Sequence, residues 1–273
     1  MKSFMKLAIY LIGMVFFTVS NDTLAASKSD QAKEKRWEEQ IVPSLLVGEA
    51  VKLKAGGSEF LGLYTENDSN KALGGAILIH GMGAHPAWPD VIEPLRMHLP
   101  EAGWHTLSVQ MPILENKAEI QDYPPLFKEV PARIQASVDY LKSKGINTIV
   151  IIGHSLGNTM TTYYLANKQD PAVRGFVAIA FGPGYPKEPK MDSYANFASL
   201  AIPTLDIYGS ADFERNLRGV KKRAQAAKKA GNQNFQQIKI EGANHFFTNM
   251  DDILLKRIRG WLQINVAGNN LKQ

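Results

Sequence analysis

The sequence predicts an α/β fold: a mostly parallel, doubly wound sheet with an antiparallel N-terminal edge. Strand-like and helix-like segments alternate from about residue 74 onward, which is typical of βαβ units. The apolar run at 148–152 lacks polar alternation, so it predicts a strand buried on both faces of a parallel sheet. Two short strand-like runs at 47–54 and 60–65 flank Gly56-Gly57 and predict an edge hairpin.

The beginning of the chain has the composition of an export signal. Lys2 and Lys6 precede an apolar run at 7–19, and small residues follow, including Ala25 and Ala26. This order predicts a signal peptide at 1–26, cleaved after Ala25 or Ala26, and therefore a periplasmic or secreted protein. The apolar run is shorter than the about 20 residues that a membrane-spanning helix needs. An uncleaved anchor is the alternative.

Composition excludes several classes of protein. The chain has no cysteine, so it has neither a disulfide framework nor a lipid-modified cysteine. Its formal net charge of +5 becomes +4 when two lysines and one aspartate are removed with the signal peptide. No nucleic-acid-binding motif accompanies this mild charge, so we expect no nucleic-acid partner. The histidines lack metal-ligand spacing, and we expect no metal and no cofactor.

The remainder predicts one domain at 45–265, preceded by a polar arm or frayed helix at 27–44 and followed by a polar tail at 266–273. In chain order we expect strands at 74–80, 103–110, 148–152, 173–181, 202–208 and 234–240, and helices at 88–99, 130–144, 158–166, 216–230 and 250–263. The helix at 130–144 has an apolar face and ends at Gly145, whereas Pro94 is unfavourable inside the helix at 88–99. The interval at 182–201 is too short for a full cap domain.

The most informative motif is Gly153-His154-Ser155-Leu156-Gly157, between the buried strand at 148–152 and an expected helix. In a strand–turn–helix context, G-x-S-x-G presents a nucleophilic serine on a strained turn. The two glycines allow strand and helix to approach closely. We therefore expect Ser155 to be a nucleophile and His154 to be a packing residue of the turn. A structural serine in an ordinary turn is the alternative.

A serine nucleophile needs a base and a group that orients the base. In this arrangement both should follow Ser155, on loops at the carboxyl ends of later strands. His245 is the only one of the six histidines beyond Ser155, and Asp212 follows the strand at 202–208. We expect His245 as base and Asp212 as acid. Asp206, in mid-strand, and the aspartates at 251–252, at a helix start, are more readily explained as structural.

Stabilising the developing oxyanion requires backbone donors near the serine. We expect these to be the N–H groups of Leu156, which follows the nucleophile, and of Met82, in the loop after the strand at 74–80. Gly81 would support this loop, and His80 would shape it.

Together, these motifs resemble the α/β-hydrolase superfamily over about residues 45–265. The segments that carry the resemblance are 80–83, 153–157, 209–212 and His245. More narrowly, the run Ile-His-Gly-Met-Gly-Ala-His-Pro-Ala-Trp-Pro at 79–89, with Gln-Met-Pro at 110–112, is similar to an exported bacterial DUF3530-type family. That resemblance implies the fold and an envelope location, but no substrate.

We expect an exported, monomeric serine hydrolase, class EC 3.1.1, that cleaves a carboxylic ester through a Ser-His-Asp triad and an acyl-enzyme. Its expected substrate is an ester of a small molecule or of the cell envelope. The alternatives are a non-catalytic envelope binding protein and a peptidase or amidase. The segment 215–229 has no acidic residue and contains seven basic ones: Arg215, Arg218, Lys221, Lys222, Arg223, Lys228 and Lys229. It predicts either peripheral contact with an anionic surface or the solvated face of an amphipathic helix.

Overall fold

The computed structural model of the chain describes residues 28–69, 71–168 and 170–266. The expected signal peptide and nearly all of the expected polar tail lie outside the described residues. Within these three ranges, no helix is long and apolar enough to cross a membrane.

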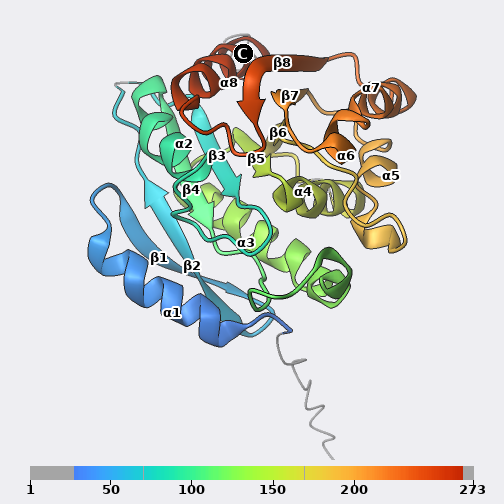
Figure 1. Cartoon of the computed structure of the whole chain (residues 1–273). Coiled ribbons are helices and arrows are strands. Elements are labelled where there is room, and N and C mark those ends of the chain that lie inside the picture. The colour runs from blue at the N-terminus through green and yellow to red at the C-terminus, as the bar shows by residue number, and fades with distance from the viewer. Residues whose placement is uncertain (1–27, 70, 169, 267–273) are drawn as a thin grey trace, which may run out of the picture.

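An eight-stranded sheet with the order β1-β2-β4-β3-β5-β6-β7-β8 forms the centre of the structure (Figure 1). Its strands are β1 (Glu49–Ala55), β2 (Ser58–Thr65), β3 (Gly74–Ile79), β4 (Trp104–Val109), β5 (Ile149–His154), β6 (Val173–Ile179), β7 (Thr204–Ala211) and β8 (Phe235–Asn244). Strand β2 pairs antiparallel with β1 and β4, and every other pair is parallel. The predicted fold class, including its antiparallel N-terminal edge, is confirmed.

Helices cover both faces of this sheet. They are α1 (Gln31–Ile41), α2 (Ile92–His98), α3 (Val130–Ser143), α4 (Leu156–Asn167), α5 (Ser193–Phe197), α6 (Glu214–Leu217), α7 (Val220–Lys229) and α8 (Asp251–Asn265). Helices α2 and α8 pack on one face, while α3, α4, α5 and α7 pack on the other (Figure 1).

The strand sequences explain these two layers. Successive side chains of a strand point to opposite faces, so Ile77 and Ile79 of β3 join the core under α3 and α4, whereas Ala76 and Leu78 join the core under α2 and α8. Because both faces are covered there, the central parallel strands β3, β5 and β6 are apolar at nearly every position, whereas the edge strand β8 is mostly polar.

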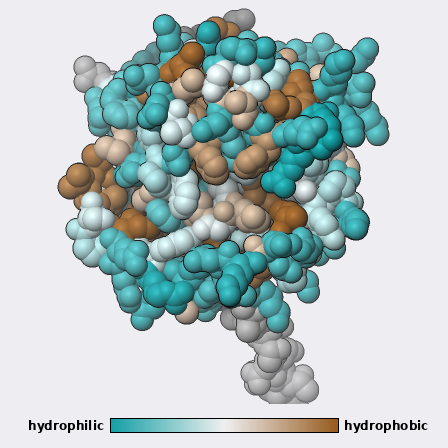
Figure 2. Space-filling model, in the orientation of Figure 1, coloured by the Kyte–Doolittle hydropathy of each residue, from teal (hydrophilic) through white to brown (hydrophobic). Residues whose placement is uncertain are grey.

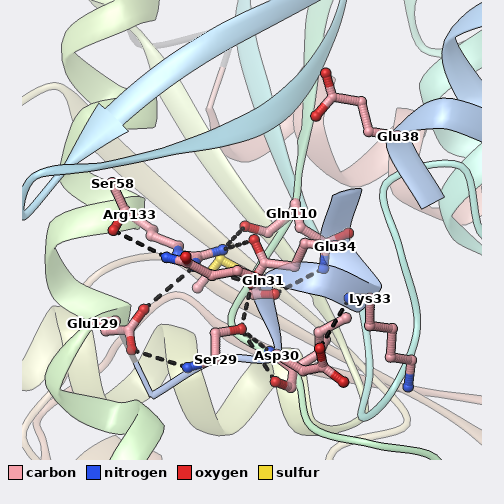
Figure 3. Close-up of polar contacts among 12 residues, drawn as sticks. Ser29, Asp30, Gln31, Lys33, Glu34, Glu38, Ser58, Gln110, Glu129 and Arg133 are labelled. Atoms are coloured by element: carbon pink, nitrogen blue, oxygen red, sulfur yellow. Dashed lines mark hydrogen bonds and ion pairs between the residues drawn. The ribbon is translucent and has the colours of Figure 1, made fainter. Parts of the chain in front are cut away.

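The segment expected to be a polar arm or frayed helix instead contains a packed helix, α1. The carboxylate of Glu34 accepts hydrogen bonds from both terminal nitrogens of Arg133 in α3, each at 3.0 Å (Figure 3). Both side chains are buried, and Ser29 also donates to Glu34. Arg133 donates in addition to the backbone oxygen of Gln110 and to Glu129. A buried ion pair therefore anchors a helix whose sequence is mostly polar.

Two expected helices have different limits. Helix α2 begins at Ile92, which places Pro94 in the first turn, where a missing backbone N–H breaks no helical hydrogen bond. The helix expected at 216–230 is divided into α6 and α7 at Gly219. The hydroxyl of Tyr194 lies against Gly219, and a Cβ there would be only 1.8 Å from it. The helix therefore divides at a glycine, a poor helix former, and the close approach of Tyr194 leaves no room for a larger residue there.

The interval between β6 and β7 contains no full cap domain. It forms a short 3₁₀ turn (Pro189–Met191) and the five-residue helix α5. Met191 and Phe197 are fully buried in the core, so this interval packs down on the sheet. Only its first residues reach the cavity described below.

Candidate active site

Ser155 lies in the sharp turn between β5 and α4. Its φ of 54° and ψ of −118° are unfavourable for a residue with a side chain, so the surrounding packing must hold it. The flanking glycines explain how. A Cβ on Gly157 would lie 2.3 Å from the backbone oxygen of Ile79, and one on Gly153 would lie 2.7 Å from Asn158 Oδ1. Larger residues at either position would push the helix away from the sheet.

The structure brings Ser155, His245 and Asp212 together at the carboxyl ends of β5, β8 and β7. His245 Nε2 is 2.9 Å from Ser155 Oγ, and His245 Nδ1 is 2.7 Å from Asp212 Oδ1. Asp212 and His245 are both buried. With the proton on Nδ1 donated to Asp212, Nε2 accepts a hydrogen bond from the serine hydroxyl, which is the arrangement of a general base beside a nucleophile.

Asn216, which sequence reasoning missed, holds Asp212 in place. Its side-chain amide donates to Asp212 Oδ1 at 3.0 Å, and the backbone N–H of Phe213 donates to the same oxygen at 2.6 Å. Asn216 is buried and follows Asp212 by four residues, across the turn that leads into α6. The Asp-x-x-x-Asn spacing is the only sequence signal of this contact, and it is weak because the turn geometry is not encoded in it.

The other carboxylates considered for the acid lie elsewhere. Asp206, in the middle of β7, is fully buried and accepts a hydrogen bond from Arg223 Nε at 2.6 Å. Arg223 also donates a hydrogen bond to the backbone oxygen of Asn216, so the Asp206–Arg223 ion pair also holds the backbone of α6 at Asn216. Asp251 and Asp252 occupy the first turn of α8, where negative charge is favourable.

Two buried histidines hold backbone loops around Ser155. His154 Nε2 lies 3.0 Å from the backbone oxygen of His245, and burial lowers the pKa of His154 to about 4. His80 Nδ1 lies 2.8 Å from the oxygen of Gly81, while its Nε2 accepts from the backbone N–H of Met111. Burial lowers the pKa of His80 to about 3. Both rings are therefore neutral near pH 7 and donate to backbone oxygens.

The loop after β3 lies directly against Ser155. A Cβ on Gly81 would be 3.3 Å from the Cβ of Ser155, so a side chain there would crowd the nucleophile. Met82 and Leu156 line the same cavity as Ser155. The two residues whose backbone N–H groups were expected to bind an oxyanion are therefore next to the serine.

A cavity of about 330 Å³ opens above Ser155. Besides Ser155, Met82 and Leu156, its walls come from 118–121, the α4 residue Thr159, Ala180, 182–184 and the α6 residues Arg215 and Asn216. Hydrophilic residues cover most of the visible molecular surface, and hydrophobic ones form small separate patches (Figure 2). Among the described residues, the exposed large hydrophobics include Met82, which lines the cavity, and Phe213 and Phe246, which contact His245. The site therefore has an apolar rim.

No group of three or more His, Asp or Glu side chains in the described part of the chain is arranged to hold a metal ion. The chemistry that the described side chains themselves support is proton transfer between Ser155 and His245.

Comparisons with known proteins agree with the fold. A family model described as "Protein of unknown function (DUF3530)" matches residues 18–126 and 121–264. Comparison with curated proteins gave no match. Solved structures with a similar fold include Est1E from Butyrivibrio proteoclasticus (15% identity, TM-score 0.60, covering 78% of this chain and 97% of that one). XC6422 from Xanthomonas campestris, an α/β serine hydrolase without a lid, is 15% identical with a TM-score of 0.62, and the match covers 81% of this chain and 96% of that one. Dienelactone hydrolase from Anabaena variabilis is 18% identical with a TM-score of 0.62, and the match covers 80% of this chain and 97% of that one.

Proposed function

The chain belongs to the DUF3530 family and has the α/β-hydrolase fold, and from this premise we propose that it is a serine hydrolase that cleaves carboxylic esters. The observation that carries the proposal is the continuous hydrogen-bonded chain from Ser155 through His245 to Asp212. The Est1E and dienelactone hydrolase similarities support ester cleavage as the reaction to test first.

In the proposed reaction, Ser155 Oγ attacks the ester carbonyl while His245 Nε2 accepts the serine proton. Asp212 stabilises the imidazolium and keeps the ring oriented. The oxygen of the tetrahedral intermediate accepts hydrogen bonds from the backbone N–H groups of Met82 and Leu156. His245 then donates its proton to the departing alcohol, which leaves an acyl group on Ser155.

Deacylation repeats these steps with water as the nucleophile. His245 takes a proton from water, hydroxide adds to the acyl carbon, and the proton returns to Ser155 Oγ as the carboxylic acid leaves. The neutral His154 and His80 take no part in proton transfer; they hold the loops that carry His245 and Met82.

The local structure supports a catalytic role over a binding role alone. A binding protein of this fold would not need Ser155 in an unfavourable backbone conformation, nor a buried carboxylate aligned with a buried histidine. The cavity volume of about 330 Å³ is at the small end for ligand pockets, which favours a short acyl group.

We also propose that the protein acts in the periplasm or outside the cell, because residues 1–26 have the pattern of a cleavable signal peptide. Expression of the full chain, fractionation and N-terminal sequencing test this. A new N-terminus at Ala26 or Ser27 in the exported fraction is expected, and retention of the intact chain in the cytoplasm would contradict it.

The activity proposal is tested with a fluorophosphonate probe, which reacts with activated serines. We expect the folded wild-type protein to be labelled and the Ser155→Ala and His245→Ala variants to remain unlabelled. Ser143→Ala is the matched control: Ser143 is an exposed serine at the end of α3, so labelling should persist. A folded wild-type protein that does not react, or labelling that persists in Ser155→Ala, would contradict the proposal.

A further inference from the structure

The cavity above Ser155 has one positively charged wall residue. Arg215 of α6 lines it together with Ser155, and it is the only lysine or arginine among the described residues of the lining. The sequence placed Arg215 in a basic segment that extends to Lys229. In the structure the basic residues of this segment have different environments, and among them only Arg215 lines the cavity.

The guanidinium of Arg215 has no carboxylate partner among the described residues, whereas two neighbouring arginines do. Arg218 pairs with Glu214 at 3.3 Å, and Arg223 is buried against Asp206. Arg215 instead lies over the ring of Phe213, with its guanidinium carbon 5.4 Å from the ring centroid. That cation–π contact holds the charge near the site without neutralising it.

Phe213 links Arg215 to the proposed catalytic histidine. The Phe213 ring is stacked on His245, with 4.2 Å between ring centroids. The order Arg215, Phe213, His245 therefore places an unpaired cation one aromatic ring away from the proposed base, at the wall of the cavity that contains Ser155.

The carboxylates of Glu119 and Asp212 are engaged by other groups. Glu119 lines it, but the Glu119 side chain caps the 3₁₀ turn Ile120–Asp122 and accepts a hydrogen bond from Gln121. Asp212 is buried and faces His245. The described residues thus leave the guanidinium of Arg215 available to a ligand.

We propose that Arg215 binds a carboxylate of the substrate, so that the preferred substrates are esters that carry an acidic group a few atoms from the scissile bond. The planar guanidinium can donate two parallel hydrogen bonds to a carboxylate, which gives orientation as well as attraction. This inference rests on the proposed function, since it names the class of ester that the same site cleaves.

The test compares pairs of esters that differ only in charge. Monoethyl adipate and its neutral primary amide place the difference in the acyl part. The butyrate esters of 4-hydroxybenzoate and of 4-hydroxybenzamide place it in the alcohol part. We expect wild-type kcat/KM to be about tenfold higher for the acid than for the amide in at least one pair. Hydrogen bonds from a guanidinium to a carboxylate are strong, but Arg215 is exposed, so solvent weakens its interaction with the substrate. The preference should decrease as salt is added.

Three variants identify the residue responsible. Arg215→Gln should abolish the acid-over-amide ratio, and Arg215→Lys should retain part of it. Arg218→Gln is the matched control, because it removes the same charge from the same segment outside the cavity lining. The ratio should keep its wild-type value in this control.

The outcomes separate the two proposals. If wild-type protein cleaves the neutral esters with no preference for the acids, or if Arg215→Gln keeps the preference, the role of Arg215 is refuted while the hydrolase proposal stands. If the folded protein cleaves none of the four esters and is not labelled by the fluorophosphonate probe, the hydrolase proposal itself fails.

Discussion

Replacing Glu34 with alanine should destabilise the protein far more than a change in an N-terminal, mostly polar helix would suggest. Glu34 accepts two hydrogen bonds from Arg133, whose side chain is buried in α3 (Figure 3). In Glu34→Ala the guanidinium would lose its bidentate partner while it remained in a site with little access to water. The cost is therefore that of a buried charge with incomplete compensation.

The loss of unfolding free energy in Glu34→Ala can be worked from the contacts that Arg133 keeps. Removing one partner of a buried ion pair costs about 3–5 kcal/mol. Arg133 keeps the carboxylate of Glu129 at 3.3 Å and the backbone oxygen of Gln110 at 3.0 Å, so we expect the lower end, about 3 kcal/mol. For a domain of this size each kcal/mol lowers the melting temperature by about 2–4 °C, which predicts a decrease of about 6–12 °C.

Equilibrium unfolding in urea and a thermal melt, both on the mature protein, provide the assay. Glu38→Ala is the control on the same helix: Glu38 pairs with Lys52 at the surface, so its loss should cost less than about 1 kcal/mol. If Glu34→Ala and Glu38→Ala lower the unfolding free energy equally, the buried ion pair does not anchor α1.

Three further predictions concern the site. Asn216→Leu removes the amide that donates to Asp212, and kcat/KM for ester substrates should fall about tenfold or more, with fluorophosphonate labelling slowed in parallel. Gly157→Ala would place a Cβ 2.3 Å from the backbone oxygen of Ile79, so the free energy of unfolding in urea should fall by about 2 kcal/mol or more. Burial lowers the pKa of His154 from 6.5 to about 4, so the stability it contributes is complete above pH 6.5 and is lost as the pH falls toward 4. Near pH 5, His154→Gln should reduce the slope of unfolding free energy against pH by about 1.2 kcal/mol per pH unit.

Each of these has a clear opposing result. Wild-type turnover in Asn216→Leu would mean that Asp212 needs no support from the amide. Unchanged stability in Gly157→Ala would show that strand and helix can separate without cost. An unchanged pH slope in His154→Gln would show that this histidine titrates alike in the folded and unfolded chains.

The elements predicted correctly from sequence are those whose signal is local. The parallel core strands, the edge hairpin and the turn at Ser155 each depend on apolar runs and glycines within a few residues of one another. The loop residues Asp212 and His245 are predicted by chain order and strand ends, and the structure places His245 beside Ser155 and Asp212 beside His245.

The features missed from sequence depend on residues far apart in the chain. Helix α1 is fixed by a partner 99 residues away, and Gly219, where the helix expected at 216–230 divides, packs against the hydroxyl of Tyr194. Arg215 was part of a basic segment, and only the tertiary arrangement shows that it lines the cavity while Arg223 is buried in the core. Periodicity carries no information about such contacts.

The most direct test of the proposed chemistry is to trap its covalent intermediate. Wild-type protein mixed with 4-nitrophenyl butyrate and quenched in acid within the first turnovers should carry one butyryl group on the peptide that contains Ser155, detected by mass spectrometry. This mass increase should be absent from Ser155→Ala. Butyrate release by the wild-type protein with Ser155 unmodified, or with the acyl group on another residue, would contradict it.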